Sequence, residues 1–209
     1  NMASVASGMA AMGKIPFIAS YAMFSPGRSW EQVRTTIAYN ESNVKIIGAH
    51  AGVSVGPDGA THQAIEDIAL MRVIPNMVVL APCDTYEAKK MTMWAADYDG
   101  PVYMRIAREK TPVVTTEDTP FVFGKLMTVL ESDKDNQVTI ISTGTLLYNA
   151  LDAGNQLNKA GINTTVAHLG TIKPLDKEAI IDAAKNSSFE NTVEEHQISG
   201  GMGSAVAEF

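Results

Sequence analysis

The sequence predicts an α/β fold made of two consecutive three-layer αβα domains, each with a mostly parallel sheet. Short apolar runs with the length of buried strands alternate with helical patterns along the whole chain. Strands separated by helices pair in parallel through right-handed crossovers, which places helices on both faces of a sheet. An apolar content of 45% in 209 residues suits a globular protein of this class that buries two modest cores.

The first half of the chain predicts one αβα unit. A helical pattern covers 2–12, and four buried strands are expected at 15–20, 44–48, 77–81 and 102–106. A helix is expected between each pair of successive strands, and each helix has a start signal. Ser29 with Gln32 has the spacing of a capping box, and so does Asp84 with Glu87. Thr61 is placed as the N-cap of the middle helix.

The second half predicts another α/β unit after a linker. Residues 108–120 are rich in threonine, proline and charge and have no sustained apolar period, so we place the domains at 1–120 and 121–209. Strands are expected at 124–130 (a sheet edge), 138–142, 164–167 and 192–194, and helices at 146–157, 177–185 and 202–208. Helical patterns reach both ends of the sequence, which suggests a fragment, a proteolysed product or a partly visible chain.

Composition narrows the classes of function. The formal net charge of −7 argues against nucleic-acid binding, which needs a basic face. Cys83 is the single cysteine, which excludes an internal disulfide and fits a reducing compartment, so we expect a cytoplasmic protein. No apolar run in the sequence reaches the length of a transmembrane helix, and we expect no membrane partner.

The most informative segment for function is residues 49–63, a glycine-broken loop after the strand at 44–48. Ligands of open α/β sheets bind outside the carboxyl ends of the strands, and this loop carries His50, Asp58 and His62 there. His50 suits a phosphate-binding or catalytic role, or a hydrogen bond to nearby backbone. His62 lies near an expected helix start and suits contact with a substrate hydroxyl, or capping. Asp58 is also typical of a turn.

Two further pairs of side chains follow expected strands at the same edge. Arg105 and Arg108 come at the end of the fourth strand, where two guanidinium groups would clamp a phosphate, and the alternative is that one of them is a surface residue. Tyr21 and Phe24 follow the first strand. Aromatic residues at that spacing usually belong to the core, and the alternative is stacking on a planar heterocycle. The sequence has no set of residues with metal-ligand spacing and no nucleophile elbow, so we expect no metal site in this chain.

Signals in the second half are weak. Gly200–Gly203 lacks the lysine of a phosphate loop, so it indicates tight packing or an interface. His168 and His196 end expected strands, and neither has an acidic or basic cluster beside it in the expected fold.

These segments together resemble the pyrimidine-binding and C-terminal domains of transketolases, in particular those whose two halves are separate chains. The central match is the loop His50–Gln63 with Glu66-Asp67. The other matching segments are Asn1-Met2, Tyr21–Phe24, Arg28–Arg34, Arg72, Pro75-Asn76, Pro82, Asp84, Gly100-Pro101, Arg108, Gly170–Asp176 and Glu194–Gly203. The resemblance covers essentially the whole chain. Pro57 is a departure, because the family commonly has glutamate there, and it removes a backbone donor from the loop.

The resemblance implies a role for each matching site residue. Phe24 would pack against the aminopyrimidine ring of thiamine diphosphate, with Tyr21 nearby. His62 would be the catalytic residue that hydrogen-bonds the reacting hydroxyls of the sugar. Asp58 would bind a hydroxyl of the donor sugar, and His50 with Arg108 would hold the sugar phosphate.

The resemblance implies transfer of a two-carbon ketol unit from a ketose phosphate to an aldose phosphate, as in the pentose phosphate pathway, with the hard chemistry supplied by the cofactor. The family's cofactor-activating glutamate would lie two residues before Asn1, and its Gly-Asp-Gly…Asn motif for the diphosphate and metal belongs to another domain. We therefore expect an N-terminal transketolase subunit or domain as partner, which binds the Mg²⁺ or Ca²⁺. We also expect self-association, as a dimer or heterotetramer, and no activity of this polypeptide alone.

Three alternatives remain open at this point. A deoxyxylulose-phosphate synthase typically has Arg-Ala-Gly at positions 50–52, where this chain has His-Ala-Gly. The β subunit of a 2-oxo acid dehydrogenase usually has His-Ser-Gln at positions 61–63, where this chain has Thr-His-Gln. A catalytically silent scaffold subunit of the same fold is the third alternative. The first two differences favour a transketolase.

Overall fold

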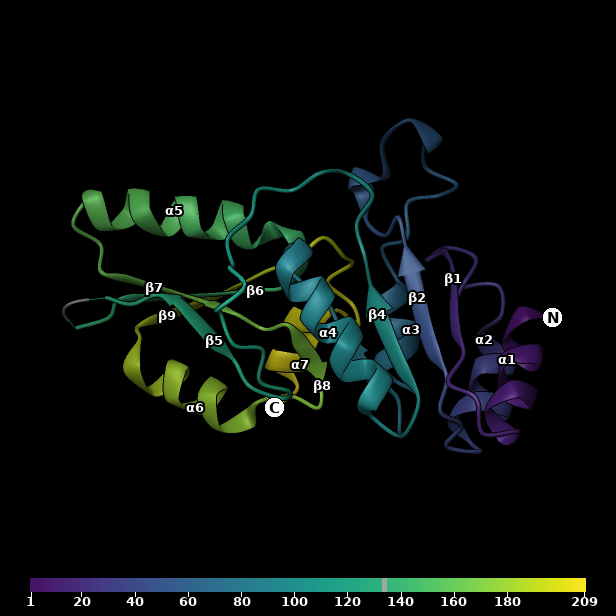
Figure 1. The fold of residues 1–209 in the computed structure, drawn as a ribbon. Helices are drawn as coiled ribbons and strands as arrows, with labels where there is room; N and C mark the ends of the chain where they lie inside the picture. The colour runs from purple at the N-terminus through teal and green to yellow at the C-terminus, as the bar shows by residue number, and fades with distance from the viewer. Residues whose placement is uncertain (133–134) are drawn as a thin grey trace.

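The structure is a computed structural model that describes residues 1–132 and 135–209. Strands alternate with helices along much of the chain, and the strands form two sheets (Figure 1). In order, the elements are α1 (Met2–Ala11), β1 (Phe17–Tyr21), α2 (Trp30–Gln32), the π-helical turn η1 (Val33–Ala38), β2 (Lys45–Ala49), the 3-10 helix η2 (Val53–Asp58), α3 (Asp67–Arg72), β3 (Val78–Leu80), α4 (Thr85–Asp97), β4 (Val102–Arg105), β5 (Met127–Leu130), β6 (Val138–Ser142), η3 (Gly144–Leu146), α5 (Leu147–Lys159), β7 (Thr164–His168), β8 (Thr171–Lys173), α6 (Lys177–Asn186), β9 (Phe189–Val193) and α7 (Met202–Ala207).

The first sheet has the strand order β1-β2-β4-β3-β8, and its neighbours pair in parallel except for β3 with β8. Successive side chains of a strand point to opposite faces, and each face has its own core. Val78 of β3 packs with Met91 of α4 on one face. Val79 belongs to the core on the other face, with Ile37 of η1 and Ile68 of α3. This unit therefore has the predicted three layers.

The second sheet has the strand order β5-β7-β6-β9, in which the edge strand β5 is antiparallel and the others are parallel. Helix α5 lies on one face, and α6 lies on the other (Figure 1). Leu147 of α5 packs with Ile140 and Val166, whereas Ile141 belongs to the core that contains Ile180 of α6. The predicted fold class, two consecutive αβα units with mostly parallel sheets, is confirmed.

Strand β8 joins the two halves. It follows β7 in the chain, yet it pairs with β3 at the edge of the first sheet. The backbone N–H of Ala81 also donates to the carbonyl of Gly170, at 2.8 Å. The core of α1, η1 and α3 continues into Leu169, Ile172 and Met202 of the second half. The sequence does not predict β8, because three residues are too few to show an alternating period.

The two predicted capping boxes differ in outcome. The Ser29 side chain makes no cap hydrogen bond, and Gln32 donates to a neighbouring carboxylate instead, so that prediction is wrong. Asp84 does cap α4, because its Oδ1 accepts from the backbone N–H of Glu87 at 3.0 Å. The Glu87 carboxylate accepts from the backbone N–H of Cys83 rather than from that of Asp84, so the reciprocal bond of a capping box is replaced.

The predicted helix start at Thr61 is also wrong, because α3 begins at Asp67. The N–H of His62 donates to the carbonyl of Gly59, and Ala51 forms an isolated bridge with Ala64. These bonds hold residues 59–64 in a turn. In the part of the chain that the structure describes, no helix combines the length and the apolar character needed to cross a membrane.

Candidate active site

Residues 50–66, which we call the site loop, connect β2 to α3 at the carboxyl edge of the first sheet. His50 turns the chain away from the sheet with a φ of 56°. The chain then returns to its starting point, because Ala51 pairs with Ala64 and the N–H of Gly52 donates to the carbonyl of Ala64 at 2.8 Å. The middle of the loop therefore projects beyond the strand ends (Figure 1).

Four of the predicted site residues form a cluster of rings at this edge. The ring centroid of Tyr21 lies 4.3 Å from that of His50 and 5.5 Å from that of His62. Phe24 meets His62 edge to face, at 5.2 Å. Nδ1 of His62 lies 2.9 Å from Oγ1 of Thr61, which orients the ring. Nδ1 of His50 is buried without a hydrogen-bond partner among the described residues, which marks a place for a ligand or water.

A cavity of about 500 Å³ lies beside Phe24, whose side chain is half-exposed, and the start of α1 also lines it. Ser25 lines the same cavity, and its hydroxyl oxygen is buried with no hydrogen-bond partner in the described part of the chain. An exposed aromatic face next to an unused hydroxyl fits a planar heterocycle with polar edges. Sequence reasoning missed Ser25, because a serine after an aromatic residue carries no distinguishing signal.

The other two predicted site residues bind each other. Nη1 of Arg108 lies 3.2 Å from Oδ2 of Asp58, and it also donates to the carbonyl of Val55 at 2.6 Å. The side chains of this pair are 31% and 30% exposed. Arg108 thus holds η2 of the site loop against the segment after β4. The pair presents a cation and an anion together, which suits a ligand with phosphate and hydroxyl groups.

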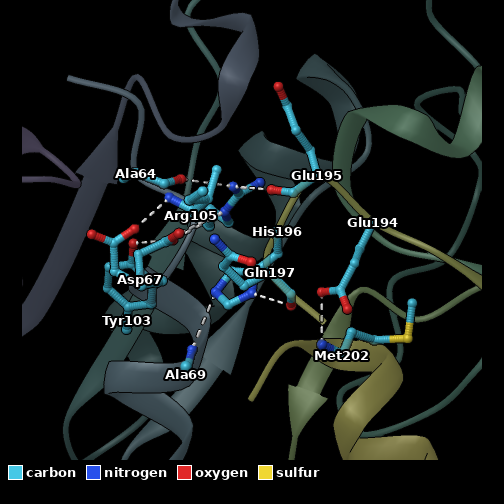
Figure 2. A network of polar contacts seen from close by, with 12 residues as sticks. Ala64, Asp67, Ala69, Tyr103, Arg105, Glu194, Glu195, His196, Gln197 and Met202 are labelled. Carbon is cyan, nitrogen blue, oxygen red and sulfur yellow. Dashed lines mark hydrogen bonds and ion pairs between the residues drawn. The ribbon is translucent and has the colours of Figure 1, made fainter. Parts of the chain in front are cut away.

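Arg105 does not join Arg108 as a phosphate clamp, so that prediction is wrong. Its side chain is 9% exposed, and its Nε donates to Oδ2 of Asp67 at 3.0 Å (Figure 2). Its Nη2 donates to the carbonyls of Ala64 and Glu195, while the Tyr103 hydroxyl donates to Asp67 at 2.7 Å. Burial alone lowers the pKa of Arg105, but the charge of Asp67 outweighs it and raises the pKa above its usual value. Arg105 is a buried cation that ties α3 and the second half to β4.

Cys83, Glu87 and His168 form the one cluster of three metal-donor side chains within residues 1–132 and 135–209. Oε2 of Glu87 accepts from the N–H of Cys83 at 2.7 Å and lies 2.8 Å from Nε2 of His168. Burial raises the pKa of Glu87, but the charge and hydrogen bond of His168 outweigh it and hold the pKa below its usual value. Burial also raises the pKa of the Cys83 thiol, which disfavours the thiolate that binds metals.

In this cluster, Glu87 and His168 form a buried hydrogen-bonded pair between α4 and β7. The expectation that His168 has no acidic neighbour is therefore wrong, since the neighbour comes from the other half of the chain. His196 has polar contacts with backbone, as its Nε2 accepts from the N–H of Ala69 at 3.4 Å (Figure 2). Gly200 packs tightly, because an added Cβ would lie 2.6 Å from Ala69, which agrees with the packing interpretation of its glycine-rich segment.

Sequence reasoning also missed Tyr103 and Glu195. A Cβ added at Gly48, in the middle of β2, would lie 2.1 Å from the Tyr103 hydroxyl. A glycine inside a strand indicates such a close approach, so Gly48 is the signal that points to Tyr103. The Glu195 carboxylate accepts from the hydroxyl of Ser54 at 3.0 Å, across 141 positions of sequence, and no local pattern predicts that contact.

Comparison with known proteins finds similarity over both halves. Residues 1–114 match the family model of the transketolase pyrimidine binding domain, and residues 127–209 match that of the transketolase C-terminal domain. The chain is 46% identical over 210 residues to the "Putative transketolase C-terminal section" of Methanocaldococcus jannaschii, which covers 100% of this chain and 65% of that protein. It is 40% identical over 205 residues to an apulose-4-phosphate transketolase subunit of Phocaeicola vulgatus, covering 98% and 65% of the two chains.

Among solved structures, the chain resembles "Split gene transketolase, inactive beta4 tetramer" with a TM-score of 0.90 and 41% identity. That similarity covers 98% of this chain and 65% of the other. The chain therefore spans 65% of the length of these relatives.

Proposed function

This chain belongs to the transketolase family, through its pyrimidine-binding and C-terminal domains, and we propose that it forms the C-terminal half of a two-part ketol transferase. The proposed reaction transfers a two-carbon ketol unit from a ketose phosphate to an aldose phosphate with thiamine diphosphate. We place the domain boundary at 120/121, inside the segment 115–126 that lies between the two matched family models. A reducing cytoplasm suits the single buried thiol of Cys83.

The observation that carries the proposal is the ring cluster at the carboxyl edge of the first sheet. Tyr21 contacts both imidazoles of the site loop, and Phe24 contacts His62 and also lines a cavity. That edge is where ligands of open α/β sheets bind. A planar cofactor ring next to Phe24 would thus lie close to His62, which is the arrangement that ketol transfer needs.

Each side chain has a task in this proposal. Phe24 packs against the pyrimidine ring, and the unused Ser25 hydroxyl hydrogen-bonds a polar edge of that ring. When bound, thiamine diphosphate supplies the electron sink for cleavage of a carbon–carbon bond next to a carbonyl. His62 hydrogen-bonds the sugar hydroxyls next to the reacting carbons and holds or moves their protons. His50 and Arg108 bind the phosphate, and Asp58 binds a donor hydroxyl.

The diphosphate and its Mg²⁺ or Ca²⁺ would be bound by a partner. Mg²⁺ and Ca²⁺ are hard cations that prefer several oxygen ligands. The one three-donor cluster in the described part of the chain contains a thiol and a histidine, and its glutamate and histidine bind each other. We therefore propose an N-terminal transketolase subunit or domain as the partner. A structural relative is described as a tetramer, and we propose that this chain also self-associates.

The test mixes this polypeptide with a chain that carries the family's diphosphate domain. Sugar products are measured by mass spectrometry, with a ketose phosphate donor, an aldose phosphate acceptor, thiamine diphosphate and Mg²⁺. We expect no transfer by either chain alone. We expect transfer by the mixture when an upstream extension supplies the family's cofactor-activating glutamate, and a loss of about 10²–10⁴-fold in the His62→Asn variant.

Three outcomes would contradict the proposal. Turnover by the isolated polypeptide would refute the idea of a half-site. A mixture that binds thiamine diphosphate but transfers nothing would favour a silent scaffold. Release of CO₂ from a 2-oxo acid, in place of ketol transfer, would favour a synthase or dehydrogenase of the same fold.

A further inference from the structure

We propose that Glu195, in the second domain, is a positioning residue for the site loop, so that this domain takes part in ketol transfer by fixing the substrate-binding residues. This inference rests on the proposed function. It concerns a residue that binds Ser54 and so acts through the site loop.

The Glu195 carboxylate binds the site loop at the start of η2. One carboxylate oxygen accepts from the backbone N–H of Ser54, and the other accepts from the Ser54 hydroxyl at 3.0 Å. The segment 53–58 consists of two short helical turns that meet at Gly56, whose φ of 77° is not helical; Ser54 lies in the first turn and Asp58 ends the second. Asp58 is fixed by Arg108. The segment 53–58 is therefore bound near its start by the second domain and at its end by the first, on either side of the break at Gly56.

Gly52 makes this contact possible. A Cβ added at Gly52 would lie 2.3 Å from Cδ of Glu195 and 2.4 Å from its Oε2, and the φ of Gly52 is +90°. A side chain at this position would therefore both strain the backbone and push the carboxylate away. The loop carries a glycine at the point where the carboxylate of the other domain approaches.

The backbone of the segment 195–197 is itself held against the first domain (Figure 2). The carbonyl of Glu195 accepts from the buried Arg105 at 2.7 Å, and the N–H of Gln197 donates to the carbonyl of Ile65 at 2.9 Å. Ile65 lies near the end of the site loop, and Ser54 lies near its beginning. The second domain therefore contacts both arms of the loop that carries His50, Asp58 and His62.

Glu194 provides a matched control within the same segment. Its carboxylate accepts from the backbone N–H groups of Met202 and Gly203, at 2.7 and 2.8 Å, so it caps α7 inside the second domain (Figure 2). Glu194 and Glu195 thus have the same side chain and adjacent positions but hold different parts of the molecule. A general effect of losing a carboxylate appears in both variants, whereas an effect on the site loop appears only when Glu195 is changed.

The first measurement is amide hydrogen exchange, in the isolated polypeptide and in its complex with the partner chain. We expect Glu195→Ala to speed exchange in residues 53–58 by at least about tenfold without changing the midpoint of global unfolding, since the loop opens locally. Glu195→Gln retains one acceptor for Ser54 and should recover part of the protection. Glu194→Ala should leave residues 53–58 unchanged and speed exchange at the start of α7.

The second measurement is steady-state ketol transfer in the complex. Displacing substrate-binding groups by about 1 Å lowers rates up to about 100-fold, so we expect kcat/KM of Glu195→Ala to fall about 10- to 100-fold. A raised KM for the phosphorylated donor should account for most of that fall, because Asp58 lies in the released segment 53–58. A merely structural role would instead lower the amount of active enzyme, and therefore the apparent kcat, with KM unchanged.

The outcomes separate this inference from the proposed function. Wild-type exchange rates in residues 53–58 of Glu195→Ala would overturn the positioning role, and so would an unchanged KM in an active complex. If Glu195→Ala does not fold, Glu195→Gln and Ser54→Ala provide the same comparison, and normal exchange and KM in both would overturn the role. Absence of ketol transfer in the wild-type complex would contradict the proposed function, while the exchange result would still decide whether Glu195 holds the loop.

Discussion

Replacing Asp67 by asparagine tests whether the buried pair with Arg105 holds the candidate site to the rest of the fold. The side chains of Asp67 and Arg105 are only 1% and 9% exposed. Asparagine keeps the shape of the side chain but removes the charge that faces the guanidinium. Loss of one partner of a buried ion pair costs about 3–5 kcal/mol, because the remaining charge is left without a counter-charge.

The contacts around the pair place the expected loss at the lower end of that range. An asparagine oxygen can still accept from the Tyr103 hydroxyl, and Nη2 of Arg105 keeps the carbonyls of Ala64 and Glu195. We therefore expect Asp67→Asn to lower the free energy of unfolding by about 3 kcal/mol. With a urea slope near 3 kcal/mol/M, the unfolding midpoint falls by about 1 M.

The assay is urea unfolding followed by tryptophan fluorescence and far-UV circular dichroism. Removing both charges of a buried pair is often nearly neutral, so adding Arg105→Met to Asp67→Asn should recover part of the loss. Glu208→Gln is the control, because Glu208 pairs with Arg72 at the exposed C-terminal end, and we expect no change in the midpoint. A loss below about 1 kcal/mol in Asp67→Asn, or strictly additive losses in the double variant, would refute the reasoning.

Further variants test other charged contacts. Arg108→Ala should weaken the binding of phosphorylated sugars by about 1.5–3 kcal/mol, the scale of a hydrogen bond to a charged group. It should weaken the binding of unphosphorylated sugars less, through the lost contact with Asp58. Equal weakening of both in calorimetry of the complex would count against its phosphate role. The pKa of Glu87 in the folded state lies below its usual 4.5. The Glu87 carboxylate therefore stabilises the fold above pH 4.5, and this stabilisation is lost on acidification. The urea midpoints of wild type and Glu87→Gln should converge as the pH falls below 4.5. Burial lowers the pKa of Lys45 to about 8, although the charge of Asp99 opposes this shift. Wild type should therefore gain thermal stability relative to Lys45→Met as the pH rises from 8 to 10.5. A difference in melting temperature that stays constant over this range would contradict the prediction.

The sequence could predict the sheet edge at which the candidate residues meet. Parallel strands bring their carboxyl ends to one edge, so residues after different strands come together although they are far apart in the chain. The structure places Tyr21 at the end of β1 and His50 directly after β2, with ring centroids 4.3 Å apart. The roles of these residues in catalysis stay predictions, because placement alone does not measure a function.

Contacts between residues far apart in the chain could not be predicted, because no local pattern encodes them. Glu87 fits a capping box by spacing, but its carboxylate binds His168, which lies 81 positions away. Thr61 has the composition of an N-cap, but the bridge between Ala51 and Ala64 holds that segment in a turn. In each case a tertiary contact competes with a local hydrogen bond and replaces it.

The two arginines at the end of β4 show how burial separates structural from functional charge. Arg105 and Arg108 lie three positions apart and each faces an aspartate, at 3.0 and 3.2 Å. The exposed pair of Arg108 with Asp58 contributes at most about 1 kcal/mol, whereas a charged hydrogen bond to a phosphate contributes about 1.5–3 kcal/mol. A phosphate can therefore replace Asp58 on Arg108 and free the carboxylate for a hydroxyl. The same exchange at Arg105 would break a buried pair at a cost of about 3–5 kcal/mol. Since both guanidinium groups carry the same charge, solvent exposure decides which of them is available to a substrate.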